Sequence, residues 1–147
     1  MGLFGRLFGR SRDDTPAARW MRRRAQAEPE DVVREYFAAM IAHDLEWMLA
    51  TFTPERCRLY TGPTTLDRKR LSVKGARITG VSPAADAPVG RVAGYGEQRA
   101  LRVEYELDLV PAEERRDPSL VDGPQWAYFL LVRQRPGQPW LIADWGR

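Results

Sequence analysis

The chain has few of the residues that most often build metal sites or covalent catalytic sites. Its 147 residues contain one cysteine, Cys57, and one histidine, His43. A single cysteine excludes an internal disulfide and a cysteine-based zinc site, and a single histidine excludes a site built on two histidines. Cys57 and His43 can formally act as a nucleophile–base pair, but a lone cysteine is more often a small buried apolar residue. We therefore expect no metal and no cofactor.

Long apolar runs are also absent from the sequence. No segment approaches the roughly 20 apolar residues of a membrane-spanning helix, and none has the length of a signal peptide's apolar region. Gly2 is not followed by the Ser or Thr of a myristoylation site. We expect a cytoplasmic protein, attached peripherally to a membrane if its N-terminal segment binds lipid.

Positive charge is concentrated near the N-terminus. Residues 1–24 hold seven arginines and two aspartates, a net charge of +5, whereas the whole chain carries +3. The remainder is therefore slightly negative, which argues against a nucleic-acid-binding surface on it. A length of 147 residues fits one domain and a tail. We place a basic, disordered tail at residues 1–28 and a folded domain at residues 29–147.

The first twelve residues repeat Leu-Phe-Gly-Arg twice. A helix with this spacing is typical of a segment that lies on an anionic membrane or in a groove of a protein partner. Each of the three glycines weakens a helix by roughly 1 kcal/mol relative to Ala, so binding would have to supply the order. A disordered start without a partner is the alternative. The candidate contact residues are Leu3, Phe4, Leu7 and Phe8 on one helical face and Arg6 and Arg10 on another.

Residues 29–54 have the most regular pattern in the chain. Pro29 is a favoured first-turn residue, and the apolar positions from Val32 to Ile41 form one broad helical face. Asp44 suits the N-cap of a second helix, whose apolar residues recur at i, i+3, i+4 and i+7 until Pro54 ends it. The pattern predicts two helices joined by a sharp turn at His43-Asp44.

From Leu71 onward the apolar period changes to two, which predicts strands. A parity switch at Gly75 indicates a bulge in the first strand. Residues 98–110 alternate most clearly, with an apolar face opposite a charged one. Residues 126–133 are apolar on both faces, which favours a central strand, and residues 140–145 follow as its hairpin partner. A short edge strand at residues 89–92 is also compatible with the sequence.

The order of helix, helix and about four antiparallel strands predicts an α+β fold in which the helix pair packs on one curved sheet. The opening VVREYFAAMIAHDLEWMLATFTPE, with Tyr36-Phe37, His43-Asp44 and Phe52, resembles the nuclear transport factor 2-like superfamily. That superfamily has a cystatin-like α+β roll and includes ketosteroid isomerase and the SnoaL-like polyketide cyclases. The closing PWLIADWGR is similar to a Gram-positive bacterial family of unknown function. The resemblance covers residues 29–147 and consists of apolar spacing, which is informative on fold and not on function.

The resemblance implies a cone-shaped cavity between the helices and the concave face of the sheet. Plain core packing is the alternative for every residue that we place in it. The superfamily often dimerises sheet to sheet, so we also expect a homodimer through the charged outer row of residues 102, 104, 106 and 108. The candidate pocket-lining residues are Tyr36, Met40, Phe52, Tyr60, Tyr105, Trp126, Tyr128 and Trp145.

Catalysis in this fold is exemplified by ketosteroid isomerase, which combines a carboxylate base with a Tyr and a protonated Asp. The resemblance places Tyr36 at the hydrogen-bonding Tyr, but Tyr60 stands 24 positions later, where the base is implied. A tyrosine of ordinary pKa, about 10, is a poor base at neutral pH. Asp144 is a candidate acid or base if it is buried, and His43 is a candidate in the turn between the helices.

We therefore expect a non-catalytic binding or interaction module, tethered to a membrane or a partner by its basic tail. The alternative is a small-molecule isomerase, cyclase or dehydratase that uses Tyr36 with Asp144 or His43. Such an enzyme requires a carboxylate or histidine within hydrogen-bond reach of the Tyr36 hydroxyl, about 3 Å.

Overall fold

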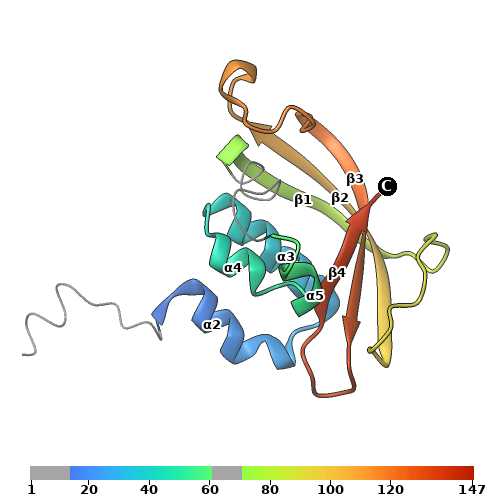
Figure 1. Cartoon of the computed structure of the whole chain (residues 1–147). Helices are drawn as coiled ribbons and strands as arrows, with labels where there is room; N and C mark the ends of the chain where they lie inside the picture. The colour runs from blue at the N-terminus through green and yellow to red at the C-terminus, as the bar shows by residue number, and fades with distance from the viewer. Residues whose placement is uncertain (1–13, 61–70) are drawn as a thin grey trace, which may run out of the picture.

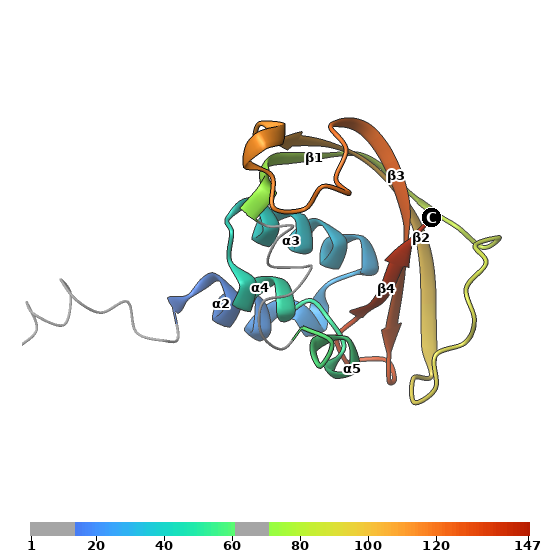
Figure 2. The same cartoon turned by 45° about the horizontal axis from the view of Figure 1, so that its top comes forward.

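The computed structural model describes residues 14–60 and 71–147, and in it helices cover one face of a single antiparallel sheet (Figures 1 and 2). This arrangement confirms the predicted α+β fold with helices packed on a curved sheet. The elements are α2 (Pro16–Arg23), η2 (Arg24–Gln26), α3 (Pro29–Ile41), α4 (Leu45–Leu49), α5 (Pro54–Cys57), β1 (Val73–Pro83), β2 (Glu97–Leu109), η3 (Ala112–Glu114), β3 (Gly123–Arg133) and β4 (Leu141–Gly146).

The four strands pair in chain order, β1-β2-β3-β4, and every neighbouring pair is antiparallel. The predicted bulge is present, since the β1–β2 register shifts between Val73 and Gly75. At the other edge, Ile142 of β4 donates its N–H to the Thr51 carbonyl at 2.8 Å and accepts from the Thr53 N–H at 3.0 Å. The segment after α4 therefore covers part of the β4 edge.

Helix α3 lies against the concave face of the sheet, which we call the inner face (Figure 2). Its N-terminus carries a capping box between Glu28 and Asp31, with Pro29 in the first turn. The predicted apolar stripe is buried, and only Ile41 at its end remains exposed. Burying such a stripe is the main source of stability for a helix of this length. The buried residues of α3 are Val32, Val33, Tyr36, Phe37, Ala39 and Met40.

The turn between α3 and α4 is a Schellman motif with histidine where glycine is usual. The Asp44 N–H binds the Ala39 carbonyl and the His43 N–H binds the Met40 carbonyl, both at 3.1 Å. His43 adopts φ 55°, a left-handed conformation that costs energy for a residue with a Cβ. The His43 Nε2 group compensates by donating to the Val73 carbonyl at 2.8 Å. Asp44 caps α4 as predicted, accepting from the Trp47 N–H at 3.0 Å.

The predicted tail contains a helix that the sequence interpretation did not include in the folded domain. Trp20 of α2 is 1% exposed and belongs to the core. The Trp20 indole N–H and the Arg24 guanidinium both donate to the Ala50 carbonyl, at 3.3 and 3.1 Å. The folded unit therefore begins before the predicted boundary at residue 29. The signal was Thr15-Pro16, since the Thr15 hydroxyl caps the helix and Pro16 occupies its first turn.

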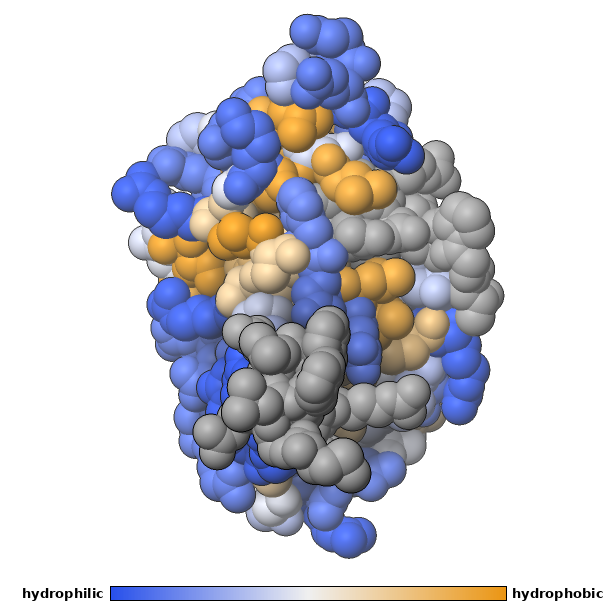
Figure 3. Space-filling view, turned by 90° about the vertical axis from the view of Figure 1, so that its left-hand side faces the viewer, coloured by the Kyte–Doolittle hydropathy of each residue, from blue (hydrophilic) through white to orange (hydrophobic). Residues whose placement is uncertain are grey.

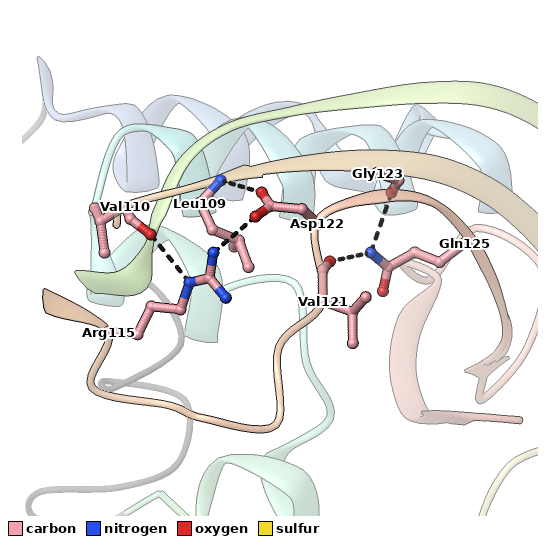
Figure 4. Close-up of polar contacts among 7 residues, drawn as sticks. All are labelled: Leu109, Val110, Arg115, Val121, Asp122, Gly123 and Gln125. Carbon is pink, nitrogen blue, oxygen red and sulfur yellow. Dashed lines mark hydrogen bonds and ion pairs between the residues drawn. The ribbon is translucent and has the colours of Figure 1, made fainter. Parts of the chain in front are cut away.

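The polar connection between β2 and β3 is held together by charged side chains (Figure 4). Arg115 donates to the Asp122 carboxylate at 2.7 Å and to the Val110 carbonyl at 3.0 Å. Asp122 also accepts from the Leu109 N–H at 3.0 Å, at the last residue of β2. The Asp122 carboxylate thus continues the hydrogen bonding of β2 beyond the end of its pairing with β3.

The prediction of an edge strand at residues 89–92 is wrong. That segment lies in the β1–β2 loop, and the Gln98 side chain accepts from the Val92 N–H at 3.0 Å and donates to the Gly90 carbonyl at 3.1 Å. A side chain therefore satisfies backbone groups that a strand would have satisfied with a neighbour.

Candidate functional site

The predicted pocket-lining residues fall on both faces of the sheet. Tyr36, Met40 and Phe52 are buried in the core under the helices. Tyr60, Tyr105 and Trp145 are partly buried and pack against the same core. Six of the eight residues thus lie between the helices and the inner face, where they pack in or against the core.

Trp126 and Tyr128 are the exceptions, because they do not lie between the helices and the inner face. Successive strand residues point to opposite faces. Ala127 and Phe129 belong to the core under the helices, so Trp126 and Tyr128 project from the convex side, which we call the outer face. Because β3 is apolar on both faces, its sequence did not reveal which rings point inward.

The rings around Tyr36 pack against one another. The Phe52 ring centroid lies 5.3 Å from that of Trp145, 5.6 Å from that of Tyr36 and 5.8 Å from that of Tyr60. Such separations are typical of aromatic pairs in contact. These side chains form a stacked core, which we call the aromatic cluster: Tyr36, Phe52, Tyr60 and Trp145.

The Tyr36 hydroxyl is buried and has no hydrogen-bond partner among the described residues. Burial raises the pKa of Tyr36 well above its ordinary range, and the nearby Arg56 charge opposes part of that shift. A hydroxyl buried without a partner costs about 1–3 kcal/mol of stability. The carboxylate or histidine that acid–base chemistry at Tyr36 requires is not within hydrogen-bond reach in the part of the chain that the structure describes.

Asp144 and His43, the other two catalytic candidates, are engaged elsewhere. The Asp144 side chain is 62% exposed, as expected for the polar side of an alternating strand. It accepts from Arg56 at 3.1 Å and from the Trp145 N–H at 2.9 Å. His43 donates to the Val73 carbonyl in the α3–α4 turn. The structure therefore does not bring Tyr36, Asp144 and His43 together.

Arg56 of α5 is a residue that the sequence interpretation did not single out. Its guanidinium lies 4.4 Å from the Trp145 ring centroid, a cation–π contact. Its Nε donates to the Tyr60 hydroxyl at 3.2 Å, and its Nη1 donates to Asp144. Arg56 thus covers one side of the aromatic cluster and links α5 to β4. The four-residue separation from Tyr60 is the one local signal for this role.

The outer face carries a second group, which we call the outer cluster: Arg102, Glu104, Trp126 and Tyr128. The Arg102 guanidinium lies 3.9 Å from the Trp126 ring centroid, and Trp126 meets Tyr128 edge to face at 5.2 Å. Arg102 also lies 3.6 Å from the Glu104 carboxylate. The predicted charged row of β2 is therefore on the outer face, where helices do not cover it in either view (Figures 1 and 2).

The geometry of the described residues does not favour a metal site or a nucleophilic cysteine. Within residues 14–60 and 71–147, no three His, Cys, Asp or Glu side chains are grouped as a metal site. The Cys57 thiol donates to the Leu49 carbonyl at 3.3 Å, and burial raises its pKa. A thiol with a raised pKa is a poor nucleophile. Cys57 is best described as a half-buried structural residue.

The chain was compared with known proteins. No protein-family model matches it, and comparison with curated proteins and with solved structures gives no significant match. Membership in the nuclear transport factor 2-like superfamily therefore stays a prediction. In the described parts of the chain, no helix combines the length and the apolar character needed to cross a membrane.

Proposed function

We propose that this chain is a non-catalytic interaction module of nuclear transport factor 2-like fold whose outer face binds a second copy of the chain. One observation carries the proposal. The outer cluster presents two aromatic rings and an arginine on the sheet face opposite the helices. Tyr, Trp and Arg are the side chains most enriched at the centres of protein interfaces.

The charges around the outer cluster favour a second copy as the partner. Arg102 and Glu104 are two residues apart on β2, and Glu106 and Asp108 continue the row. In a two-fold interface the same patch meets itself. An antiparallel approach of two β2 strands would set Arg102 of one copy against the acidic residues of the other, and such complementarity selects both partner and register.

Charge exchange tests this interface. Arg102→Glu and Glu104→Arg should each convert the dimer to a monomer, because like charges then face each other across the two-fold axis. An equimolar mixture of the two variants should form a heterodimer, since one copy then offers two carboxylates and the other two guanidinium groups. Mass is measured by sedimentation equilibrium, and folding is monitored by circular dichroism.

Arg34→Glu is the matched control, because Arg34 is an exposed arginine of α3 on the helical side of the molecule. It should leave the dimer intact. A native chain that stays monomeric at high micromolar concentration contradicts the proposal, and so do single variants that keep the dimer mass.

The basic N-terminal segment is proposed as a tether to an anionic membrane. Residues 1–12, with Leu3, Phe4, Leu7, Phe8, Arg6 and Arg10, lie outside the described residues. The neighbouring helix supports the proposal, since Met21 of α2 is 49% exposed in an arginine-rich helix. The molecular face on this side shows apolar groups among hydrophilic ones (Figure 3).

Vesicle sedimentation tests the tether. The full chain should sediment with vesicles of anionic phospholipid, and Phe4→Ser with Phe8→Ser should release it, because the apolar contribution to interfacial binding is then lost. Equal sedimentation with and without residues 1–12 excludes this role.

A small-molecule isomerase, cyclase or dehydratase is the second candidate, favoured by the unpartnered Tyr36 hydroxyl. A ligand with a hydrogen-bond acceptor would satisfy that group. An apolar ketone that raises the melting temperature of the native chain but not of Tyr36→Phe would support this candidate. An equal shift for both proteins would contradict it.

A further inference from the structure

A groove lies between α5, the β1–β2 loop and β4. It has a volume of about 440 Å³. Leu59 on one side and Val89 on the other are 65% and 37% exposed, which is unusual for aliphatic side chains that flank the same depression. Leu130 is part of its lining. Solvent therefore contacts apolar side chains on both walls of the groove.

A smaller hollow of about 140 Å³ continues the groove toward the end of β4. The two share Pro88, Val89, Leu130 and Asp144, so they form one depression along the last strand. A depression that follows a strand suits an extended chain, whose alternate side chains point the same way.

The loop wall of the groove is fixed by specific hydrogen bonds. Gln98 holds the backbone at Gly90 and Val92, as described above. The Tyr95 hydroxyl donates to the Glu55 carboxylate of α5 at 2.7 Å, which joins the loop to the opposite wall. A wall held at several points loses little conformational freedom when a ligand binds, and affinity benefits from such preorganisation.

Two carboxylates and two guanidinium groups line the groove, and all of them except Arg91 are engaged by described neighbours. Glu55 is bound by Tyr95, and Asp144 is bound by Arg56. Arg91 is exposed and forms no hydrogen bond or ion pair with any residue that the structure describes. The groove therefore offers one uncommitted guanidinium beside apolar walls, and a guanidinium prefers a carboxylate partner.

We propose that this groove binds an extended peptide segment of a partner protein, with a carboxylate flanked by apolar side chains. Arg91 binds the carboxylate, and Leu59 and Val89 cover the apolar side chains. Tyr128 of the outer cluster lines the smaller hollow, whereas Arg102 and Trp126 line neither part of the depression. Arg102→Glu therefore tests peptide binding separately from self-association.

Selection from a phage-displayed library of random twelve-residue peptides tests the site on the full chain. Enriched peptides should share an Asp or Glu with apolar neighbours at alternate positions. Fluorescence anisotropy with a labelled enriched peptide then measures affinity. Arg91→Glu should weaken binding at least tenfold, and Leu59→Ser about tenfold, since about 1.4 kcal/mol corresponds to a factor of ten.

Two controls separate this site from general effects of charge and from dimerisation. Arg135→Glu removes an exposed arginine in the β3–β4 turn, outside the groove, and should leave the affinity unchanged. Arg102→Glu should also retain peptide binding, whatever its oligomeric state. A peptide whose carboxylate is replaced by Lys should bind Arg91→Glu better than it binds the native chain.

The affinity measurements can either support or overturn the proposed peptide site. Loss of affinity confined to Arg91→Glu and Leu59→Ser, with recovery by the Lys peptide, supports the site. Failure to enrich any peptide overturns it, as does an enriched peptide that binds Arg91→Glu as tightly as the native chain.

Discussion

Tyr128 and Phe129 are neighbours on β3 with similar rings, yet they lie on opposite faces of one sheet. Phe129 is 2% exposed and contacts the Tyr36 and Phe37 rings beneath the helices. Tyr128 contacts Trp126 on the outer face and remains partly exposed. The comparison shows that aromatic content does not identify the core of this protein. The helical layer decides which ring of a pair becomes a core residue and which remains partly exposed on the outer face.

Truncation of the Phe129 and Tyr128 side chains should give the largest difference in stability between the two faces of the sheet. Phe129→Ala should lower the free energy of unfolding by about 3–5 kcal/mol, because it removes buried area and leaves a cavity. Tyr128→Ala should cost about 1 kcal/mol or less, as at other surface sites. Urea unfolding at neutral pH measures both, on a background of Arg102→Glu so that dissociation of the proposed dimer does not contribute. Equal losses for the two variants would mean that the outer face is already covered.

Removal of single hydroxyl groups tests the same two faces of the sheet. Here the larger expected change in the free energy of unfolding is a gain and not a loss. Tyr36→Phe should raise the free energy of unfolding by about 1 kcal/mol, because it eliminates a buried hydroxyl without a partner. Tyr128→Phe is the matched control on the outer face and should change stability by less than about 0.5 kcal/mol. A loss of stability in Tyr36→Phe would show that this hydroxyl has a partner, such as a bound ligand.

The smallest effect is expected at the Tyr95–Glu55 bond, which joins the outer-face loop to the helical side. The hydrogen bond from Tyr95 holds the pKa of Glu55 below its usual value. Since the folded state favours ionised Glu55, this stabilisation is present above the ordinary pKa of glutamate and is lost as the pH falls through the lowered value. Solvent screens the exposed Glu55 carboxylate, so the effect is small.

Tyr95→Phe should therefore be slightly less stable than the native chain at pH 7, and the difference should disappear as the pH falls through the lowered pKa of Glu55. Thermal unfolding across this range measures the difference. Tyr95→Phe combined with Glu55→Gln should show no further pH dependence from this pair. A difference that persists once Glu55 is protonated would assign the contribution of Tyr95 to packing.

The fold was predictable where its signals are local. The apolar stripe of α3, the Asp44 cap and the alternation in β2 each arise from residues within a few positions of one another. Trp20 shows the limit of such signals, because its burial depends on Ala50, 30 positions away. Its arginine-rich neighbours favour solvent exposure, whereas Thr15-Pro16 is the local signal for the start of the helix.

The site was less predictable, because it depends on contacts between distant segments. Arg56 and Asp144 are 88 positions apart, and no local pattern connects them. The charged row of β2 could be assigned to one face because its other face is uniformly apolar. Trp126 and Tyr128 could not, since β3 is apolar at successive positions and its parity follows only from its pairing with β2.

The closure of the β4 edge has a consequence for how copies of this protein can assemble. Ile142 exchanges backbone hydrogen bonds with residues 51 and 53, and the Asp144 carboxylate accepts from the Trp145 N–H. An edge whose donors are engaged is a poor template for adding another strand. Growth through β4 into an open-ended fibre is thereby disfavoured, whereas the proposed association through the outer face would end after one pairing. The short segment Thr51–Thr53 thus makes the β4 edge a poor template for aggregation.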